Sequence, residues 1–167
     1  NLNVAAGSCA GELTLHVISG QTDYVADGGA LSTLRKDLAE PAAKIMGGHP
    51  VEEVKVTVQT LAAICAKHCT EPIDFLKIDV EGWEKQVIEG ADFVRFRPQV
   101  LVIEATAPNV AFQGFDKIEA IAGWHEWEPT LLQANYHFAY FDGLNRFYVR
   151  DEDAATLLPL FALPVGL

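Results

Sequence analysis

The stretch that decides the fold is Ile73 to Ala91, with the sequence IDFLKIDVEGWEKQVIEGA. Its first part, Ile73 to Val80, is rich in apolar and β-branched residues and predicts a strand. Glu81-Gly82 predicts a turn, Trp83 to Glu89 predicts a helix, and Gly90 is expected to end that helix. The stretch therefore reads as a strand that turns sharply into a helix.

The residues that follow extend this unit toward the C-terminus. Gln99 to Ile103 is a continuous apolar run that ends in Glu104, and such a run suits a strand covered on both faces of a parallel sheet. Strand, helix and strand within about 30 residues is the length of a βαβ unit. A further helix is predicted from about Trp127 to Ala134, because Pro129 is tolerated only in the first turn of a helix.

A β-hairpin is predicted near the C-terminus. Tyr136 to Phe141 and Asn145 to Val149 are aromatic-rich strand sequences, and the segment between them contains the Asp142-Gly143 turn pair. The tail, from Asp151 to Leu167, is expected to begin as a short helix. A parallel βαβ unit followed by an antiparallel hairpin indicates a Rossmann-like α/β domain.

Upstream of the βαβ unit, three strands and two helices are expected. The strands are Leu2 to Ala6, Glu12 to Ile18 and Val51 to Gln59; the helices are Leu34 to Met46 at most, inside a loop from Ser19 to Gly48, and a helix capped by Thr60 that runs to about Lys67. No repeat or linker divides the chain, so we expect one domain over residues 1–167.

Composition and charge exclude several classes of function. The 167 residues are 50% hydrophobic and 21% charged, which is ordinary for a globular domain. The net charge of −11 and the absence of a basic stripe argue against binding to nucleic acid or to anionic membranes. No apolar run approaches the roughly 20 residues of a membrane-spanning helix. Three cysteines are too few for a disulfide scaffold, which favours a cytoplasmic location.

Cys65, His68 and Cys69 would lie on one face of the predicted helix, as zinc ligands can. A closed zinc site needs a fourth ligand, and no obvious partner pair follows. A helix with two small apolar thiols near the core is the favoured reading, and no metal is assigned to this chain.

The order of these segments resembles one protein family. The segment from Ile73 to Ala91 is similar to the central signature of FkbM-type methyltransferases. The resemblance extends through NVAAGSCAGELTLHV (Asn3 to Val17), VKVTVQTLAAIC (Val54 to Cys65), RPQVLVIEAT (Arg97 to Thr106), WEP (Trp127 to Pro129) and FAYFDGLNRFYV (Phe138 to Val149). It covers nearly the whole chain in the correct order.

The resemblance implies a class I methyltransferase fold, which is a mostly parallel Rossmann-like sheet with a C-terminal antiparallel hairpin. It implies S-adenosylmethionine as the cofactor and O-methylation of a hydroxyl on a small-molecule or glycan acceptor such as a sugar or natural product. We assign cofactor binding to Gly7, Ser8, Asp79 and Gly82.

The sequence departs from the family pattern at its start. Family members carry, before the region equivalent to Asn3, a strand with a glycine-rich turn and a second strand that ends in an acidic residue for the ribose. Neither occurs here, so we expect a fold without these N-terminal strands and no useful affinity of the chain as given for S-adenosylmethionine. Extra N-terminal residues in a complete parent protein would restore catalysis. The alternative function is a non-catalytic remnant that serves as an interaction or glycan-binding domain.

Without those two strands, the sheet would have a gap near 10 Å wide beside an apolar strand edge. Three arrangements would fill this gap or cover the exposed strand edge: further N-terminal residues, an edge-paired or swapped homo-oligomer, or direct pairing of the remaining strands.

Three acidic residues are the candidate chemical groups. Open α/β sheets bind ligands at the carboxyl ends of their strands, where Asp79, Glu81 and Glu104 are expected to converge. Asp79 is the first candidate for the base that takes the acceptor proton, and Glu81 is the second. Glu104 could hold the acceptor or a cation, because hard cations prefer carboxylates. Lys77 shares a strand face with Asp79, so a purely structural ion pair is the competing interpretation.

His137, Asp142 and Asn145 are assigned to acceptor binding by their place in the hairpin. The competing readings are that His137 is packed in the fold and that Asp142 and Asn145 only stabilise the turn. Trp124 and Trp127 are expected in the core, with a sugar-stacking face as the alternative.

Overall fold

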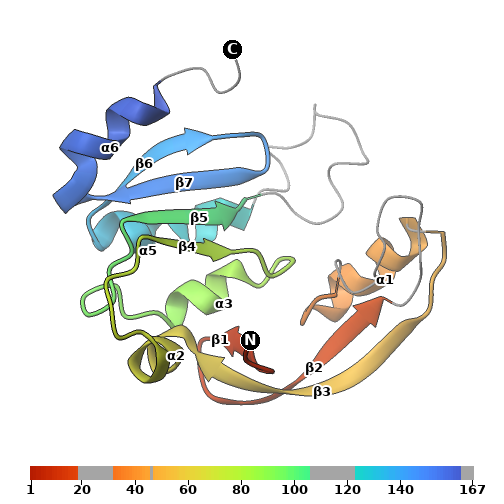
Figure 1. Ribbon diagram of the computed structural model, residues 1–167. Helices are drawn as coiled ribbons and strands as arrows, with labels where there is room; N and C mark the ends of the chain where they lie inside the picture. Colours follow the sequence, from red (N-terminus) through yellow and green to blue (C-terminus); the bar gives the residue numbers. More distant parts are fainter. Residues whose placement is uncertain (19–31, 46, 106–122, 163–167) are drawn as a thin grey trace.

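The first of two small mixed sheets contains the N-terminal strands (Figure 1). In the computed structural model, which describes residues 1–18, 32–45, 47–105 and 123–162, its strands are β1 (Ala5–Gly7), β2 (Gly11–Ile18) and β3 (Val51–Thr60). Strand β3 lies in the middle, parallel to β1 and antiparallel to β2.

The second sheet contains the βαβ unit and the hairpin. Its order is β4 (Phe75–Ile78), β5 (Val100–Glu104), β7 (Asn145–Arg150) and β6 (Tyr136–Phe141). Strands β4 and β5 are parallel, whereas β7 is antiparallel to both β5 and β6. The predicted βαβ unit and C-terminal hairpin are therefore confirmed.

The predicted helices are present in the described part of the chain, with slightly different ends. They are α1 (Lys36–Ile45), α2 (Leu61–His68), α3 (Glu84–Glu89) and α5 (Glu128–Gln133), followed in the tail by a 3-10 turn, η3 (Asp151–Asp153), and by α6 (Ala154–Phe161); a second 3-10 turn, η2 (Gly123–Glu126), precedes α5. Thr60 caps α2 as predicted, since its hydroxyl accepts from the Ala63 amide at 3.1 Å. Of the expected loop from Ser19 to Gly48, residues 19–31 and Met46 lie outside the described residues.

The α/β class is confirmed, but the expectation of one mostly parallel sheet is wrong for the described residues. Of the five strand pairs, two are parallel and three antiparallel. One cause is that β2 runs back along β3 over eight residue pairs, from Gly11↔Val58 to Ile18↔Val51. Direct pairing of the remaining strands does not occur, because β1 and β4 are edge strands of different sheets.

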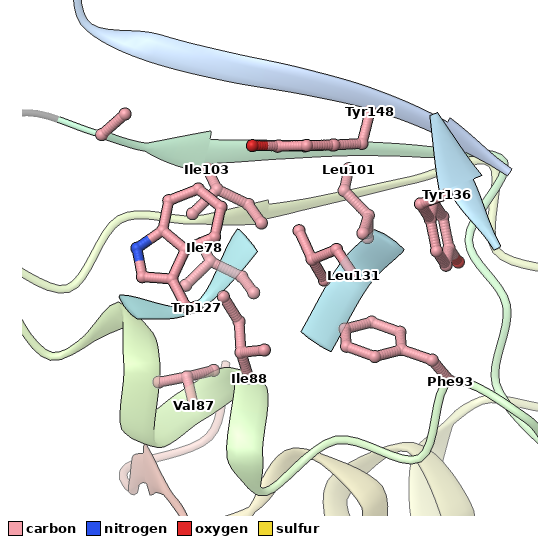
Figure 2. Close-up of a cluster of buried hydrophobic side chains, with 11 residues drawn as sticks. Ile78, Val87, Ile88, Phe93, Leu101, Ile103, Trp127, Leu131, Tyr136 and Tyr148 are labelled. Carbon is pink, nitrogen blue, oxygen red and sulfur yellow. The ribbon is translucent and has the colours of Figure 1, made fainter. Parts of the chain in front are cut away.

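The main hydrophobic core lies between the second sheet and helices α3 and α5 (Figure 2). Alternate residues of β5 point into it, and both Leu101 and Ile103 are fully buried. Its other large members are Ile78, Val87, Ile88, Phe93, Trp127, Leu131, Tyr136 and Tyr148. Trp127 is thus a core residue, as predicted. Helix α6 contacts β6 and β7 at the far edge of the sheet (Figure 1).

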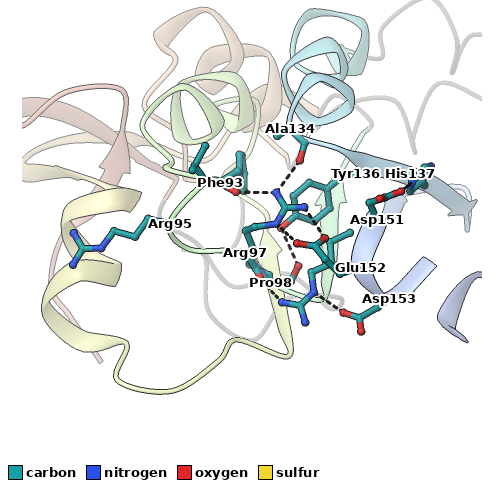
Figure 3. Close-up of polar contacts among 12 residues, drawn as sticks. Phe93, Arg95, Arg97, Pro98, Ala134, Tyr136, His137, Asp151, Glu152 and Asp153 are labelled. Atoms are coloured by element: carbon teal, nitrogen blue, oxygen red, sulfur yellow. Dashed lines mark hydrogen bonds and ion pairs between the residues drawn. The ribbon is translucent and has the colours of Figure 1, made fainter. Parts of the chain in front are cut away.

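An arginine network closes one end of the second sheet (Figure 3). Arg97 donates to the carbonyl oxygens of Phe93 at 2.9 Å and Ala134 at 2.8 Å, and pairs with Glu152 at 2.6 Å. Arg150 donates to the Arg97 carbonyl at 2.7 Å. Arg150 is the last residue of β7, and its amide bonds to the carbonyl of Gln99, just before the start of β5. The network therefore lies at the opposite end of β5 from Glu104, which pairs with Asn145 at the start of β7.

Helix α3 packs against β1 as well as against the second sheet, and the contact leaves no room for a side chain at Gly90. A β-carbon there would lie 2.1 Å from the Gly7 carbonyl oxygen. We expect Gly90→Ala to lower the free energy of unfolding by about 1–3 kcal/mol, as overpacking does. Urea unfolding measures this, with Gly11→Ala as the control because the space beside Gly11 is open. Equal stabilities of the two variants would contradict the packing argument.

Candidate functional site

The turn after β4 contains two residues with a left-handed backbone conformation, and one of them is not a glycine. Glu81 has φ of 52° and Gly82 has φ of 88°, both in the left-handed region. Glycine adopts this conformation freely, but for a glutamate it costs on the order of 1 kcal/mol. A strained glutamate at a strand end is typical of functional sites, where the surrounding structure holds it in place.

Two buried side chains hold this turn. Glu84, which is 8% exposed, accepts hydrogen bonds from the Val80 amide at 3.2 Å and the Gly82 amide at 3.1 Å. The Thr33 hydroxyl donates to the Glu81 carbonyl oxygen at 2.7 Å. Sequence reasoning missed both residues. An acid in the first turn of α3 was a usable signal for Glu84, whereas nothing near Thr33 pointed to a residue 48 positions away.

Three carboxylates meet at the ends of β4 and β5. One oxygen from each of Asp79, Glu81 and Glu104 lies within 4.8 Å of the others. Strands β4 and β5 are parallel neighbours, so their carboxyl ends share one edge of the sheet, and the predicted convergence of the three acids is confirmed. Glu104 is buried at 8% exposure, while Asp79 is partly exposed.

Burial and mutual repulsion disfavour the charged forms of these acids. Desolvation, reinforced by the charges of Asp79 and Glu84, raises the pKa of Glu81 to about 7. Desolvation, reinforced by Glu81 and Asp79, raises the pKa of Glu104 to about 9. At neutral pH the cluster therefore retains protons that isolated glutamates would have lost.

The ion pair that competes with a chemical role for Asp79 is also present. The Lys77 ammonium lies 2.8 Å from Asp79 Oδ2, and the two side chains are 49% and 34% exposed. A pair this exposed contributes at most about 1 kcal/mol to stability. Asp79 thus belongs both to the pair and to the cluster.

The raised pKa values predict how stability depends on pH. The native state keeps protons on Glu81 and Glu104 that the unfolded chain releases above about pH 4.3. The unfolding free energy should therefore fall as pH rises from about 4 through the native pKa values of about 7 and about 9. Urea unfolding across this range should give a shallower fall for Glu104→Gln than for the wild type. An unchanged slope in that variant, equal to that of the exposed control Glu89→Gln, would contradict the prediction.

A cleft of about 830 Å³ lies between β1 and the turn after β4. One wall consists of residues 4–6, which include the start of β1, with Leu15 of β2, and the other includes Asp79, Glu81 and Trp83. The remaining lining residues are Ser32, Leu34, Lys77 and Val80. The volume is in the range of about 300–1,000 Å³ that is typical of ligand and cofactor sites.

Several polar atoms at this cleft have no hydrogen-bond partner among the described residues. They are Ser32 Oγ, Glu81 Oε2 and Trp83 Nε1, all buried and all from residues that line the cleft. Glu104 Oε2 and Asn145 Oδ1 are also buried and have no hydrogen-bond partner among the described residues. Because buried polar atoms are normally paired, these atoms are available to hydrogen-bond a group that enters the cleft.

Asn145 and Asp142, two of the hairpin residues assigned to acceptor binding, have different surroundings. Asn145 lies directly opposite Glu104 in the ladder, so their side chains share a sheet face. Asp142 accepts from the amides of Leu144 at 2.8 Å and Asn145 at 2.6 Å, and so stabilises the turn. Partial burial acts to raise the pKa of Asp142, but these hydrogen bonds lower it overall.

His137 does not join the carboxylate cluster. His137 pairs with Val149 of β7, and Val149 pairs with Val100 of β5. Val100 is four residues along β5 from Glu104, a distance of about 13 Å at roughly 3.3 Å per residue. The Nε2 atom of His137 lies 2.6 Å from Asp151 Oδ1 instead.

The four residues assigned to cofactor binding do not all lie at the cleft. Asp79 lines the cleft, and Gly82 is in the turn beside it. Gly7 is buried, and a β-carbon there would lie 2.9 Å from Val58 Cγ1, so its small size serves packing. Ser8 is exposed, and neither Gly7 nor Ser8 lines the cleft.

The fold and this site define an α/β domain with a cleft at the carboxyl ends of parallel strands. A family model, the methyltransferase FkbM domain, matches residues 1–138, which is most of the chain. The chain belongs to the FkbM methyltransferase family. No curated protein and no solved structure matches it. In the part of the chain that the structure describes, every helix is too short or too polar to cross a membrane.

Proposed function

We propose that the protein is an S-adenosylmethionine-dependent O-methyltransferase that acts on a hydroxyl of a sugar, glycan or natural product. The observation that carries this proposal is the cleft, which places a strained acidic turn and several unpaired buried polar atoms beside one cavity. Membership in the FkbM family supports the reaction class.

The cleft suits the cofactor in size and in charge. Its volume of about 830 Å³ accommodates a nucleoside-sized ligand. Asp79 and Glu81 supply the negative charge that attracts a sulfonium or ammonium group, and Trp83 Nε1 is a buried donor without a partner. We assign Trp83 to holding the cofactor, with the two acids at the side of the cleft where the acceptor reacts. When bound, S-adenosylmethionine supplies a methyl group on a positively charged sulfur.

Glu81 is better suited than Asp79 to take the acceptor proton. A pKa of about 7 lies near the working pH, and Glu81 Oε2 is unpaired, whereas Asp79 is paired with Lys77. Glu81 accepts the hydroxyl proton as the new C–O bond forms. With S-adenosylmethionine bound, the bond between its sulfur and the methyl carbon would break in the same displacement, and the electron pair would stay on sulfur. Asp79 and Glu104 orient the acceptor hydroxyl.

The test is a transfer assay on the full-length protein with methyl-labelled S-adenosylmethionine and a panel of sugars, glycans and polyols. The expected result is label in an acceptor as a base-stable methyl ether, identified by NMR. Label on nitrogen or carbon would overturn the assignment to oxygen. Binding of a glycan with no transfer to any acceptor would favour the non-catalytic alternative.

A further inference from the structure

The geometry points to a binding site for a hard divalent cation, of the Mg²⁺, Mn²⁺ or Ca²⁺ class, formed by Asp79, Glu81 and Glu104. Their three ligand oxygens lie within 4.8 Å of one another. Oxygens on opposite sides of a bound Ca²⁺ are about 4.6–5.2 Å apart, and those across Mg²⁺ are about 4 Å apart. One ion can therefore contact all three carboxylates with little or no movement of the side chains.

The strongest argument for a ligand here is Glu104. Its side chain is at the end of a central strand, only 8% exposed, and its Oε2 atom has no hydrogen-bond partner among the described residues. A buried carboxylate oxygen without a partner is costly. Glu81 Oε2 is buried and unpaired in the same cluster. A cation would satisfy both oxygens and offset the repulsion between the acids.

Asn145 offers a fourth ligand atom. It is paired with Glu104 in the β5–β7 ladder, so the two side chains project from the same face. Its Nδ2 donates to Asp142 at 3.1 Å, which leaves Oδ1 buried and without a partner. Amide oxygens and carboxylates together are ordinary ligands of hard cations.

Lys77 is the positive charge that lies against the cluster, 2.8 Å from Asp79 Oδ2. Its ammonium partly neutralises the acids and should compete with a bound cation. The lysine is half exposed, so it can turn into solvent when an ion enters. Removing its charge should strengthen cation binding, and removing Glu104 should weaken it.

The role of the ion, unlike its binding, rests on the proposed function. An acceptor hydroxyl that reaches such an ion becomes more acidic and is oriented toward the cofactor, which eases the loss of its proton. Binding itself needs neither cofactor nor acceptor, so it can be tested without any turnover.

The experiment is calorimetric titration of the EDTA-treated, full-length protein with MgCl₂, MnCl₂ and CaCl₂, in the absence of cofactor. We expect saturable binding of one ion for at least one metal, with a matching rise in Tm. Glu104→Gln should weaken binding at least tenfold and Lys77→Gln should strengthen it. Glu89→Gln, which removes an exposed charge at the other end of α3, is the control and should leave binding unchanged.

Loss of folding cannot mimic this result, because Glu104→Gln removes buried repulsion and should be at least as stable as the wild type in EDTA. Absence of saturable binding by the wild type would overturn the inference and leave shared protons as the explanation of the cluster. Equal binding by Glu104→Gln and Glu89→Gln would also overturn it. An inactive protein that still binds the ion would count against the proposed function alone.

Discussion

Replacing Glu81 with glutamine is expected to lower kcat by about 10²- to 10⁴-fold, which is the range that a positioned general base contributes. The amide keeps the size of the side chain but cannot accept the proton. The backbone of the turn should be unaffected, because Glu84 and Thr33 hold it through main-chain atoms. Initial rates of methyl transfer from labelled S-adenosylmethionine measure the effect.

Asp79→Asn is the companion variant. We expect a loss of about 10²-fold or more, because Asp79 faces the same cleft and orients the acceptor. A pH profile separates the two roles. The acidic limb of kcat, near the Glu81 pKa of about 7, should persist in Asp79→Asn and disappear in Glu81→Gln. Near-normal turnover of Asp79→Asn would reduce Asp79 to the structural partner of Lys77.

The largest effect on stability is expected from Glu128→Ala, which should lower the free energy of unfolding by about 3–5 kcal/mol. Glu128 Oε1 accepts from Arg146 Nη2 at 2.6 Å and from the Tyr148 hydroxyl at 2.8 Å. The Arg146 and Glu128 side chains are only 13% and 15% exposed. Removing the glutamate leaves a mostly buried guanidinium, stacked 3.9 Å from the centre of the Trp124 ring, without its counter-charge.

Urea unfolding tests this expectation against a matched exposed pair. Glu126 contacts Lys85 at 3.2 Å, but its side chain is 65% exposed, so Glu126→Ala should cost less than about 1 kcal/mol. The double variant Glu128→Leu with Arg146→Met should recover most of the loss, since it removes both charges together. Similar stabilities of Glu128→Ala and Glu126→Ala would show that burial of the Arg146 pair contributes nothing.

The stacking of Arg146 on Trp124 also bears on the acceptor site. The guanidinium carbon lies 3.9 Å from the centre of the Trp124 ring and 4.1 Å from that of Phe138. A ring face covered in this way is not free to stack on a sugar. The hypothesis that Trp124 or Trp127 binds a sugar therefore has no support from the described residues, since Trp127 is 2% exposed in the core.

Local sequence determined the secondary structure and the convergence of the three acids. The strand, turn and helix of residues 73–91 follow from apolar patterning and from Gly82, and the hairpin follows from its aromatic strands and the Asp142-Gly143 turn. The meeting of Asp79 with Glu104 needed only one further rule, that parallel neighbours end at the same edge of a sheet. These features depend on contacts that are close in sequence or on simple topology.

The tertiary structure alone decided which side chains support the cluster and how it is charged. Thr33 reaches Glu81 across 48 positions, and the pKa of Glu104 rises because distant segments remove it from water. The placement of His137 away from the site, and the separation of β1 from β4 into two sheets, likewise depend on strand pairing. Burial and pairing of this kind arise between segments far apart in the chain, so no local pattern of residues could have determined them.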